Sequence, residues 1–284
     1  MAKVHDWDAL ARDMAAVPGR SRKRVAELLH KRMPQLHAGI ARVKDSPWPL
    51  ECWGQSNNFD VIARQRIVDP KVLGAIGQVA GFELAGSSCH SGLLHTYGYM
   101  FSVIDTPYGK KRDRWVRPTL DKGFGLPQRS LRVMPTDGTL LHNVTWWLAR
   151  IAWRDDPVWQ RRLLRSKQHV SAAVVGYDYA ALEITRILQS VRLADRRLVE
   201  LYTEFVPFPC RRTKAEHALL LYWCRTRRCG KRLLTAFPVS AASMAEGVAL
   251  GRVAAGVARP GFNACIEGFD EPRPARCQLA TGTG

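Results

Sequence analysis

"ALLLYWCRTRRCGKRLLTAFPV", residues 218–239, carries the clearest structural signal in this chain. Two apolar runs with aromatic and branched side chains flank a short basic segment that contains a glycine. Such a pattern is typical of a β-hairpin. We therefore predict strands at 218–224 and 232–239, joined by a basic tip.

Apolar periodicity predicts the other elements. Two short helices are expected within 5–33, with Ser21 as the N-cap of the second, and another helix is expected to begin at Pro70. Alternating apolar and polar residues predict strands at 58–68 and 95–105. The remaining helices are predicted at 139–155, 180–205 and 241–258.

Strands and helices follow one another without a regular βαβ rhythm, which favours an α+β fold. We expect a mixed or antiparallel sheet packed against two long amphipathic helices, at 139–155 and 180–205. The expected organisation is a helical N-terminal lead (1–45), a main α+β domain (46–272) and a disordered tail (273–284).

The chain is strongly basic, with 43 Lys and Arg against 25 Asp and Glu and a formal net charge of +18. Such a field attracts nucleic acid, acidic lipid or anionic small molecules, although an arginine-rich composition alone would also produce it. No apolar run approaches the roughly 20 residues that a membrane helix needs. The charged opening "MAKVHDWDAL" is unlike a signal peptide, and the seven cysteines form no CxxC pair. We therefore expect a cytoplasmic protein with free thiols and no membrane partner.

The predicted strand at 95–105 carries the candidate catalytic side chains. An imidazole titrates near neutrality and can move a proton at working pH, so His95 is the candidate acid or base. Tyr97 on the same strand face would orient it, and His142 is the third candidate. The alternative is a half-buried aromatic ladder. A metal held by His90, His95 and His142 is disfavoured because side chains five residues apart on a strand point to opposite faces; we expect neither metal nor cofactor.

The segment "GKKRDRWVRP", 109–118, is the first candidate for anion binding. Its guanidinium and ammonium groups match phosphate or carboxylate, and Trp115 would stack on a base. The candidate clamp consists of Lys110, Lys111, Arg112 and Arg114. Two further basic segments, 161–167 and 211–232, would join it if they lie on one face. The alternative is a solvated hairpin tip.

The end of the hairpin offers one likeness to a known family. "RLLTAFPV", residues 232–239, resembles the strand that ends in Thr-Ala-Phe/Tyr-Pro in some bacterial ribonuclease toxins. The resemblance covers eight residues and implies that Thr235 lies beside the scissile phosphate. From strand propensity alone, Thr235 is an ordinary β-branched strand residue.

Three functions fit these features. The first is an RNA- or nucleotide-directed enzyme that cleaves phosphodiesters without metal, because the 2′-hydroxyl is the nucleophile and protein cations neutralise the oxyanion. The second is a small-molecule enzyme acting on a carboxylate- or phosphate-bearing metabolite. The third is a non-catalytic nucleic-acid-binding protein. No phosphate loop, dinucleotide fingerprint or nucleophile elbow is present in the sequence.

Overall fold

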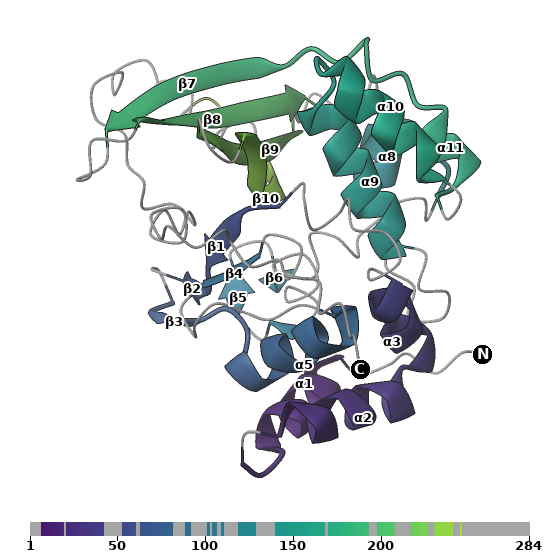
Figure 1. The fold of residues 1–284 in the computed structure, drawn as a ribbon, viewed down its shortest axis with the longest axis vertical. Helices are drawn as coiled ribbons and strands as arrows, with labels where there is room; N and C mark the ends of the chain where they lie inside the picture. Colours follow the sequence, from purple (N-terminus) through teal and green to yellow (C-terminus); the bar gives the residue numbers. More distant parts are fainter. Residues whose placement is uncertain are drawn as a thin grey trace, which may run out of the picture.

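The protein is described by a computed structural model, shown in Figure 1. It describes residues 7–19, 21–42, 53–60, 63–81, 89–91, 101–102, 104–106, 109–110, 119–128, 140–167, 170–192, 198–207, 217–226, 230–240 and 245. The predicted disordered tail lies outside these residues, as does the predicted helix at 241–258 apart from residue 245.

Short helices form the N-terminal part: α1 (Trp7–Ala16), α2 (Arg22–Arg32) and α3 (Pro34–Ala41). The hydroxyl of Ser21 accepts a hydrogen bond from the backbone N–H of Arg24 at 3.3 Å, which confirms the predicted N-cap of α2. The third helix is an addition to the two that the periodicity predicts. It begins at Pro34, because proline is favoured in the first helical turn.

Helix α5 (Pro70–Ala80) confirms the helix expected from Pro70 and holds the end of α1. The side chain of Asp69 caps its first turn by accepting from the N–H of Lys71 at 2.8 Å. The Lys71 ammonium then donates to the carbonyls of Ala15 and Val17, at 2.9 and 2.8 Å. These carbonyls lie at the C-terminal end of α1, where a cation is favourable.

Six short strands form two-stranded antiparallel pairs: β1 (Gln55–Asn57) with β4 (Cys89–Ser91), β2 (Phe59–Asp60) with β3 (Gln65–Arg66), and β5 (Asp105–Thr106) with β6 (Gly109–Lys110). The single strand predicted at 58–68 is wrong, because Arg64 has a φ of 51° and the chain turns back between β2 and β3. The strand predicted at 95–105 does not pass through Phe101, whose backbone is helical.

A second group of helices precedes the main sheet: α8 (Thr119–Gly123), α9 (Leu140–Ala152), α10 (Pro157–Arg165) and α11 (Ala172–Val175). Helix α9 confirms the prediction at 139–155 and ends three residues earlier than expected. A new helix then starts at Pro157, capped by Asp156, whose carboxylate accepts from the N–H groups of Val158 and Trp159 at 3.0 Å each.

The main sheet is an antiparallel meander of β7 (Thr185–Arg192), β8 (Leu198–Pro207), β9 (His217–Thr226) and β10 (Gly230–Ser240), in the order β10-β9-β8-β7. Strands β9 and β10 confirm the predicted hairpin. The long helix predicted at 180–205 is wrong, because this segment forms β7 and β8. Its apolar residues do not make one buried stripe, since Leu188 and Leu198 are 50% and 51% exposed.

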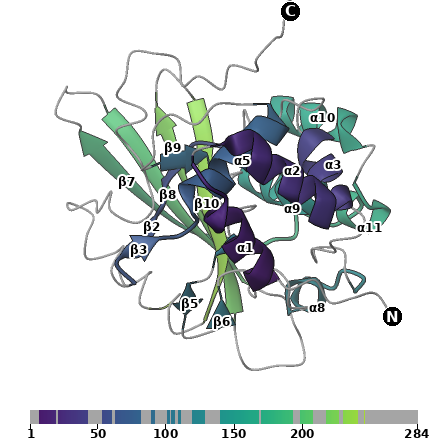
Figure 2. The same cartoon turned by 90° about the horizontal axis from the view of Figure 1, so that it is seen from below.

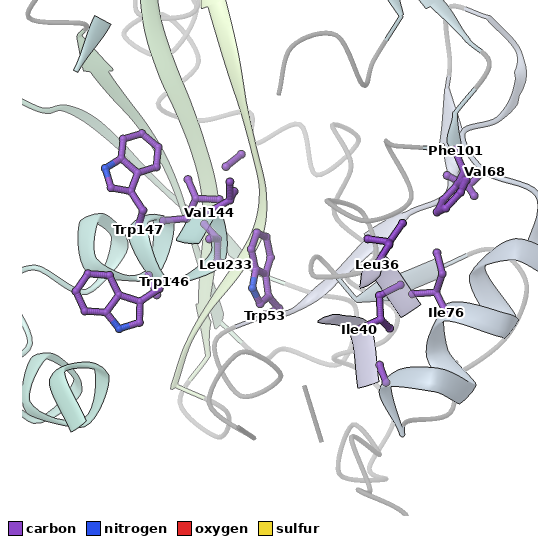
Figure 3. Close-up of a cluster of buried hydrophobic side chains, with 14 of the residues drawn as sticks. Leu36, Ile40, Trp53, Val68, Ile76, Phe101, Val144, Trp146, Trp147 and Leu233 are labelled. Carbon is purple, nitrogen blue, oxygen red and sulfur yellow. The ribbon is translucent and has the colours of Figure 1, made fainter. Parts of the chain in front are cut away.

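The fold is therefore α+β with antiparallel sheets, as the sequence predicts. Figure 2 shows the four long strands side by side, with the helices beside them. One hydrophobic core runs from the N-terminal helices to α9 and the sheet. Trp53 lies at the junction: it forms a backbone bridge with Leu233 of β10, and its ring lies between α9 and the N-terminal helices in Figure 3. In the parts of the chain that the structure describes, every helix is too short or too polar to span a bilayer.

Candidate functional site

The structure locates only some of the residues that the sequence singles out. His95, Tyr97, Lys111, Arg112, Arg114 and Trp115 lie outside the described residues. His142 lies in α9 and Lys110 in β6, but only their backbones are described. The convergence of His95 with His142 and with the basic clamp therefore stays a prediction.

Thr235 is the one predicted site residue whose side chain is described. It lies on β10 opposite Tyr222, just after an irregularity in the register that begins at Leu233. Its side chain is buried, with 1% exposed, and its hydroxyl has no hydrogen-bond partner within the described part of the chain. A buried hydroxyl without a partner costs about 1–3 kcal/mol. The strand position is as predicted, and the role beside a phosphate stays a prediction.

Helix α10 presents a basic face to solvent. Arg161, Arg162 and Arg165 are all exposed, and Val158 beside them is 64% exposed. Residues three and four positions apart lie on one side of a helix, so these four side chains form a continuous surface, here called the α10 outer face. The chain from 157 to 177 contains four Lys and Arg and no Asp or Glu.

The opposite side of α10 is occupied by the core. Leu163 is fully buried, and its carbonyl accepts from the indole N–H of Trp146 in α9 at 2.9 Å. The ring of Trp159 lies 5.3 Å from that of Trp153, centre to centre. The side-chain amide of Gln160 donates to the Trp153 carbonyl at 2.7 Å. These contacts fix the helix so that its arginines face outward.

A buried ionic cluster lies where the end of α9 meets the sheet. The carboxylate of Glu204, on β8, is completely buried. Arg154 donates to it through both Nη atoms at 3.2 and 3.4 Å, and Arg186 of β7 donates through Nε at 2.6 Å. Asp155, which is 70% exposed, accepts from Nη2 of Arg186 at 3.1 Å. We call these four residues the charged centre.

The two arginines balance the buried carboxylate. Removing a carboxylate from water carries a large desolvation penalty, which only close and well-oriented cations offset. Burial by itself lowers the pKa of Arg186, but the hydrogen bonds and negative charges of Glu204 and Asp155 outweigh this and raise it overall. Arg186 therefore stays charged throughout the physiological range.

Lys231 on β10 is a buried cation with no carboxylate within ion-pair distance among the described residues. Its ammonium donates to the carbonyl of Ala152 at the end of α9. It lies 3.4 Å from the ring centre of Trp223 and 5.4 Å from that of Trp153. Burial lowers the pKa of Lys231 to about 7; Glu204 opposes the shift, and the positive charges of Arg154 and Arg186 add to it.

Aromatic rings join Lys231 to the charged centre. The rings of Tyr202 and Trp223, on β8 and β9, are parallel within 3° and lie 3.6 Å apart, centre to centre. Lys231 lies against Trp223, and the Arg186 guanidinium lies 5.9 Å from the ring of Tyr202. A cation, two stacked rings and a second cation thus cross all four strands of the sheet.

Sequence reasoning missed the charged centre, because the region of Glu204 and Arg186 reads as a helix when only its leucines, isoleucines and valines are counted. One available signal is the run "LVELYTEFV", 198–206, in which two glutamates and a tyrosine alternate with Leu201, Thr203 and Phe205. On a strand, this spacing places Glu200, Tyr202 and Glu204 on one face. The structure places them there, and the Tyr202 hydroxyl donates to Glu200 at 2.7 Å.

The described residues contain no group of three or more His, Cys, Asp or Glu side chains placed to hold a metal ion. Comparisons with family models, with curated protein sequences and with solved structures found no match to this chain.

Proposed function

We propose that this protein binds RNA through the α10 outer face. The observation that supports the proposal is the placement of Arg161, Arg162 and Arg165 on the exposed side of one helix, within a segment free of acidic residues. Arginine donates planar pairs of hydrogen bonds that match phosphate oxygens. A row of such groups on a rigid helix is suited to successive phosphates of one strand.

The helix is better suited to a nucleic acid than to a lipid surface. An interfacial helix inserts a broad apolar face among the lipid chains. In α10, Leu163 and the Trp159 ring already pack against the protein. Val158 and Leu164 are the large hydrophobic residues left exposed on this helix, at 64% and 39%. That surface is too small for stable insertion, whereas the arginines suffice for phosphate contacts.

The surroundings of Trp159 favour a single-stranded partner. The ring packs against Trp153 and the residue is partly exposed, and the Arg162 guanidinium lies 5.1 Å from the ring centre, so this guanidinium is the plane offered to a base. Single-strand binding surfaces combine cations that follow the backbone with aromatic or guanidinium planes on which bases stack. An unpaired RNA strand is therefore the natural probe.

A second exposed basic region provides a matched control. Helix α2 presents Lys23, Arg24 and Lys31 to solvent, and Figure 1 shows α2 at the opposite end of the molecule from α10. Replacing these three residues removes the same formal charge as replacing the three arginines of α10. If RNA affinity depends only on the net charge of the protein, the two variants will lose the same affinity. If it depends on the α10 outer face, only the α10 variant will lose it.

The test measures the affinity for a labelled single-stranded RNA at several salt concentrations. Each phosphate contact on a single strand contributes about 0.7 to the slope of log K against log salt. Replacing Arg161, Arg162 and Arg165 by glutamine should therefore reduce the slope by about 2 and weaken binding at least tenfold in low salt. The matched replacement of Lys23, Arg24 and Lys31 should change affinity less than threefold. Equal losses in the two variants would refute the α10 surface.

Catalysis is a separate part of the proposal, centred on His95. If the protein cleaves the RNA it binds, His95→Ala should abolish cleavage and leave RNA retention on α10 unchanged. The α10 variant should lose both in parallel at low RNA concentration. Retention without cleavage in the unaltered protein would favour the non-catalytic nucleic-acid-binding alternative.

A further inference from the structure

The outer side of the charged centre has the geometry of an oxyanion site. Nη2 of Arg186 lies 3.1 Å from Oδ2 of Asp155, and Nη2 of Arg154 lies 3.7 Å from the same oxygen. Two guanidinium groups therefore converge on one oxygen at the protein surface. Arg154 and Arg186 are themselves held from the inside by the buried carboxylate of Glu204. Their orientation thus does not depend on what lies outside.

The group that now fills this position is loosely held. The Asp155 side chain is 70% exposed, and its contacts among the described residues are those to Arg154 and Arg186. Within this cluster the charges of Arg154 and Arg186 balance those of Glu204 and Asp155, so the cluster becomes positive once Asp155 moves into solvent, and Lys231 adds further positive charge where it is protonated. A competing anion would therefore be attracted here rather than repelled.

We propose that Arg154 and Arg186 form a binding site for a phosphate group, and that Asp155 occupies it as an internal competitor. The Asp155 carboxylate stands where one phosphate oxygen would bind. A phosphate group offers more acceptor oxygens than a carboxylate, so it can engage the outward N–H groups of both guanidinium groups together. Displacing Asp155 into solvent is inexpensive because it is already mostly hydrated.

The N-terminus of α10 adds little to this site. The backbone N–H groups of Val158 and Trp159, in its first turn, already donate to the Asp156 carboxylate. The proposed ligand is therefore held by arginine side chains, and replacement of those side chains tests the site directly. The inference does not depend on RNA binding by α10, because inorganic phosphate alone is the probe.

The experiment is calorimetric titration of the full chain with inorganic phosphate at constant ionic strength. Asp155→Asn removes the negative charge of the competitor and keeps its shape. A neutral amide oxygen holds the two guanidinium groups less strongly, so phosphate should bind at least tenfold more tightly than to the unaltered protein. Adding Arg186→Lys, which keeps a positive charge beside Glu204, should remove that gain. Asp13→Asn is the matched control, because within the described part of the chain Asp13 forms an exposed ion pair with one arginine, Arg32, at 2.5 Å. It should leave phosphate affinity unchanged.

Two results would overturn the proposal: phosphate affinities of the unaltered protein and Asp155→Asn that agree within twofold, or a gain that survives Arg186→Lys. If a variant folds poorly, thermal unfolding of the unaltered protein with increasing phosphate at constant ionic strength provides a second test. A ligand that binds only the folded state raises the midpoint in line with saturation of its site, whereas exclusion of phosphate from the protein surface gives a rise without saturation. No rise at high phosphate concentration would also refute the site. RNA carrying a 5′-phosphate, compared with RNA carrying a 5′-hydroxyl, then distinguishes a terminal phosphate from free phosphate as the ligand.

Discussion

Arginines occur on both sides of Pro157, and their surroundings are opposite. Before it, Arg154 is 16% exposed and held by the buried carboxylate of Glu204. After it, Arg161 and Arg165 are exposed on a helix whose neighbouring sequence, from 157 to 177, holds no acid. In the first environment the positive charge balances a buried carboxylate. In the second it faces solvent, where an anionic partner can reach it.

A high net charge can therefore include two kinds of cation: those that balance buried carboxylates and those that face solvent. A formal charge of +18 does not show where cations are available, because some of them balance buried carboxylates. Pairing with the buried Glu204 holds Arg154 and Arg186 in place, so only their outward N–H groups are left to contact a small anion. Arg161 and Arg165 are exposed, and the sequence from 157 to 177 contains no Asp or Glu, which favours a binding role for this face of α10. Each of the following variants alters one side of this contrast.

The largest effect is expected from removing the buried negative charge. Glu204→Gln leaves Arg154 and Arg186 without their carboxylate, and breaking a buried ion pair in this way destabilises proteins by about 3–5 kcal/mol. Since Arg186 is 38% exposed, solvent will screen part of the loss, and we expect the lower end of that range. Urea unfolding monitored by tryptophan fluorescence measures the change.

Glu200→Gln provides the control on the same strand and face. Glu200 accepts one hydrogen bond from the Tyr202 hydroxyl and is partly exposed, so its replacement should cost less than about 1 kcal/mol. Comparable losses from the two glutamine variants would contradict the special role of Glu204 in the charged centre.

A smaller effect, of opposite sign, is expected at Lys231. In the folded protein its pKa is lowered from 10.5 to about 7, so the unfolded chain binds more protons between these values. Folding stability should therefore rise with pH from about 7 to about 10, and the full penalty is present below pH 7. Lys231→Met removes the buried charge and should stabilise the protein by about 2 kcal/mol at pH 6.

The pH dependence of that gain is the decisive readout. The advantage of Lys231→Met should shrink as the pH rises from 7 toward 10, where the amine is already neutral in the folded state. Urea unfolding at pH 6, 8 and 9.5 measures it, with Lys23→Met, at an exposed position, as the control. A loss of stability at pH 6, or a gain independent of pH, would mean that Lys231 is not a strained buried cation.

The sequence predicts the parts of this fold that have a strong local signal. The hairpin at 218–239 combines apolar strands with a basic tip, and α9 combines apolar periodicity with a proline beyond its end; both are confirmed. The segment 180–205 has leucines and valines that fit either a helical or a strand period, so local pattern alone does not choose between them. The segment forms strands in the folded protein because β8 then pairs with β7 on one side and with β9 on the other.

The candidate site could be predicted only in part for a related reason. The basic segment 161–167 is visible in the sequence, and the structure places its arginines on one exposed face. The charged centre brings together Arg154 from the turn after α9, Arg186 from β7 and Glu204 from β8. Residues so far apart in the sequence have no characteristic spacing, so a single sequence does not show that they meet. Pairing, which decides whether an arginine is structural or free to bind, is likewise set by the fold.

Arginine-specific modification with phenylglyoxal, read by mass spectrometry with and without saturating single-stranded RNA, tests the central claim most directly. The account predicts that Arg161, Arg162 and Arg165 react rapidly in the free protein and at least fivefold more slowly with RNA. Arg154 should react slowly in both states, and Arg24 on α2 should react rapidly in both. Protection of Arg24 equal to that of α10, or no protection of α10 at saturating RNA, would contradict it.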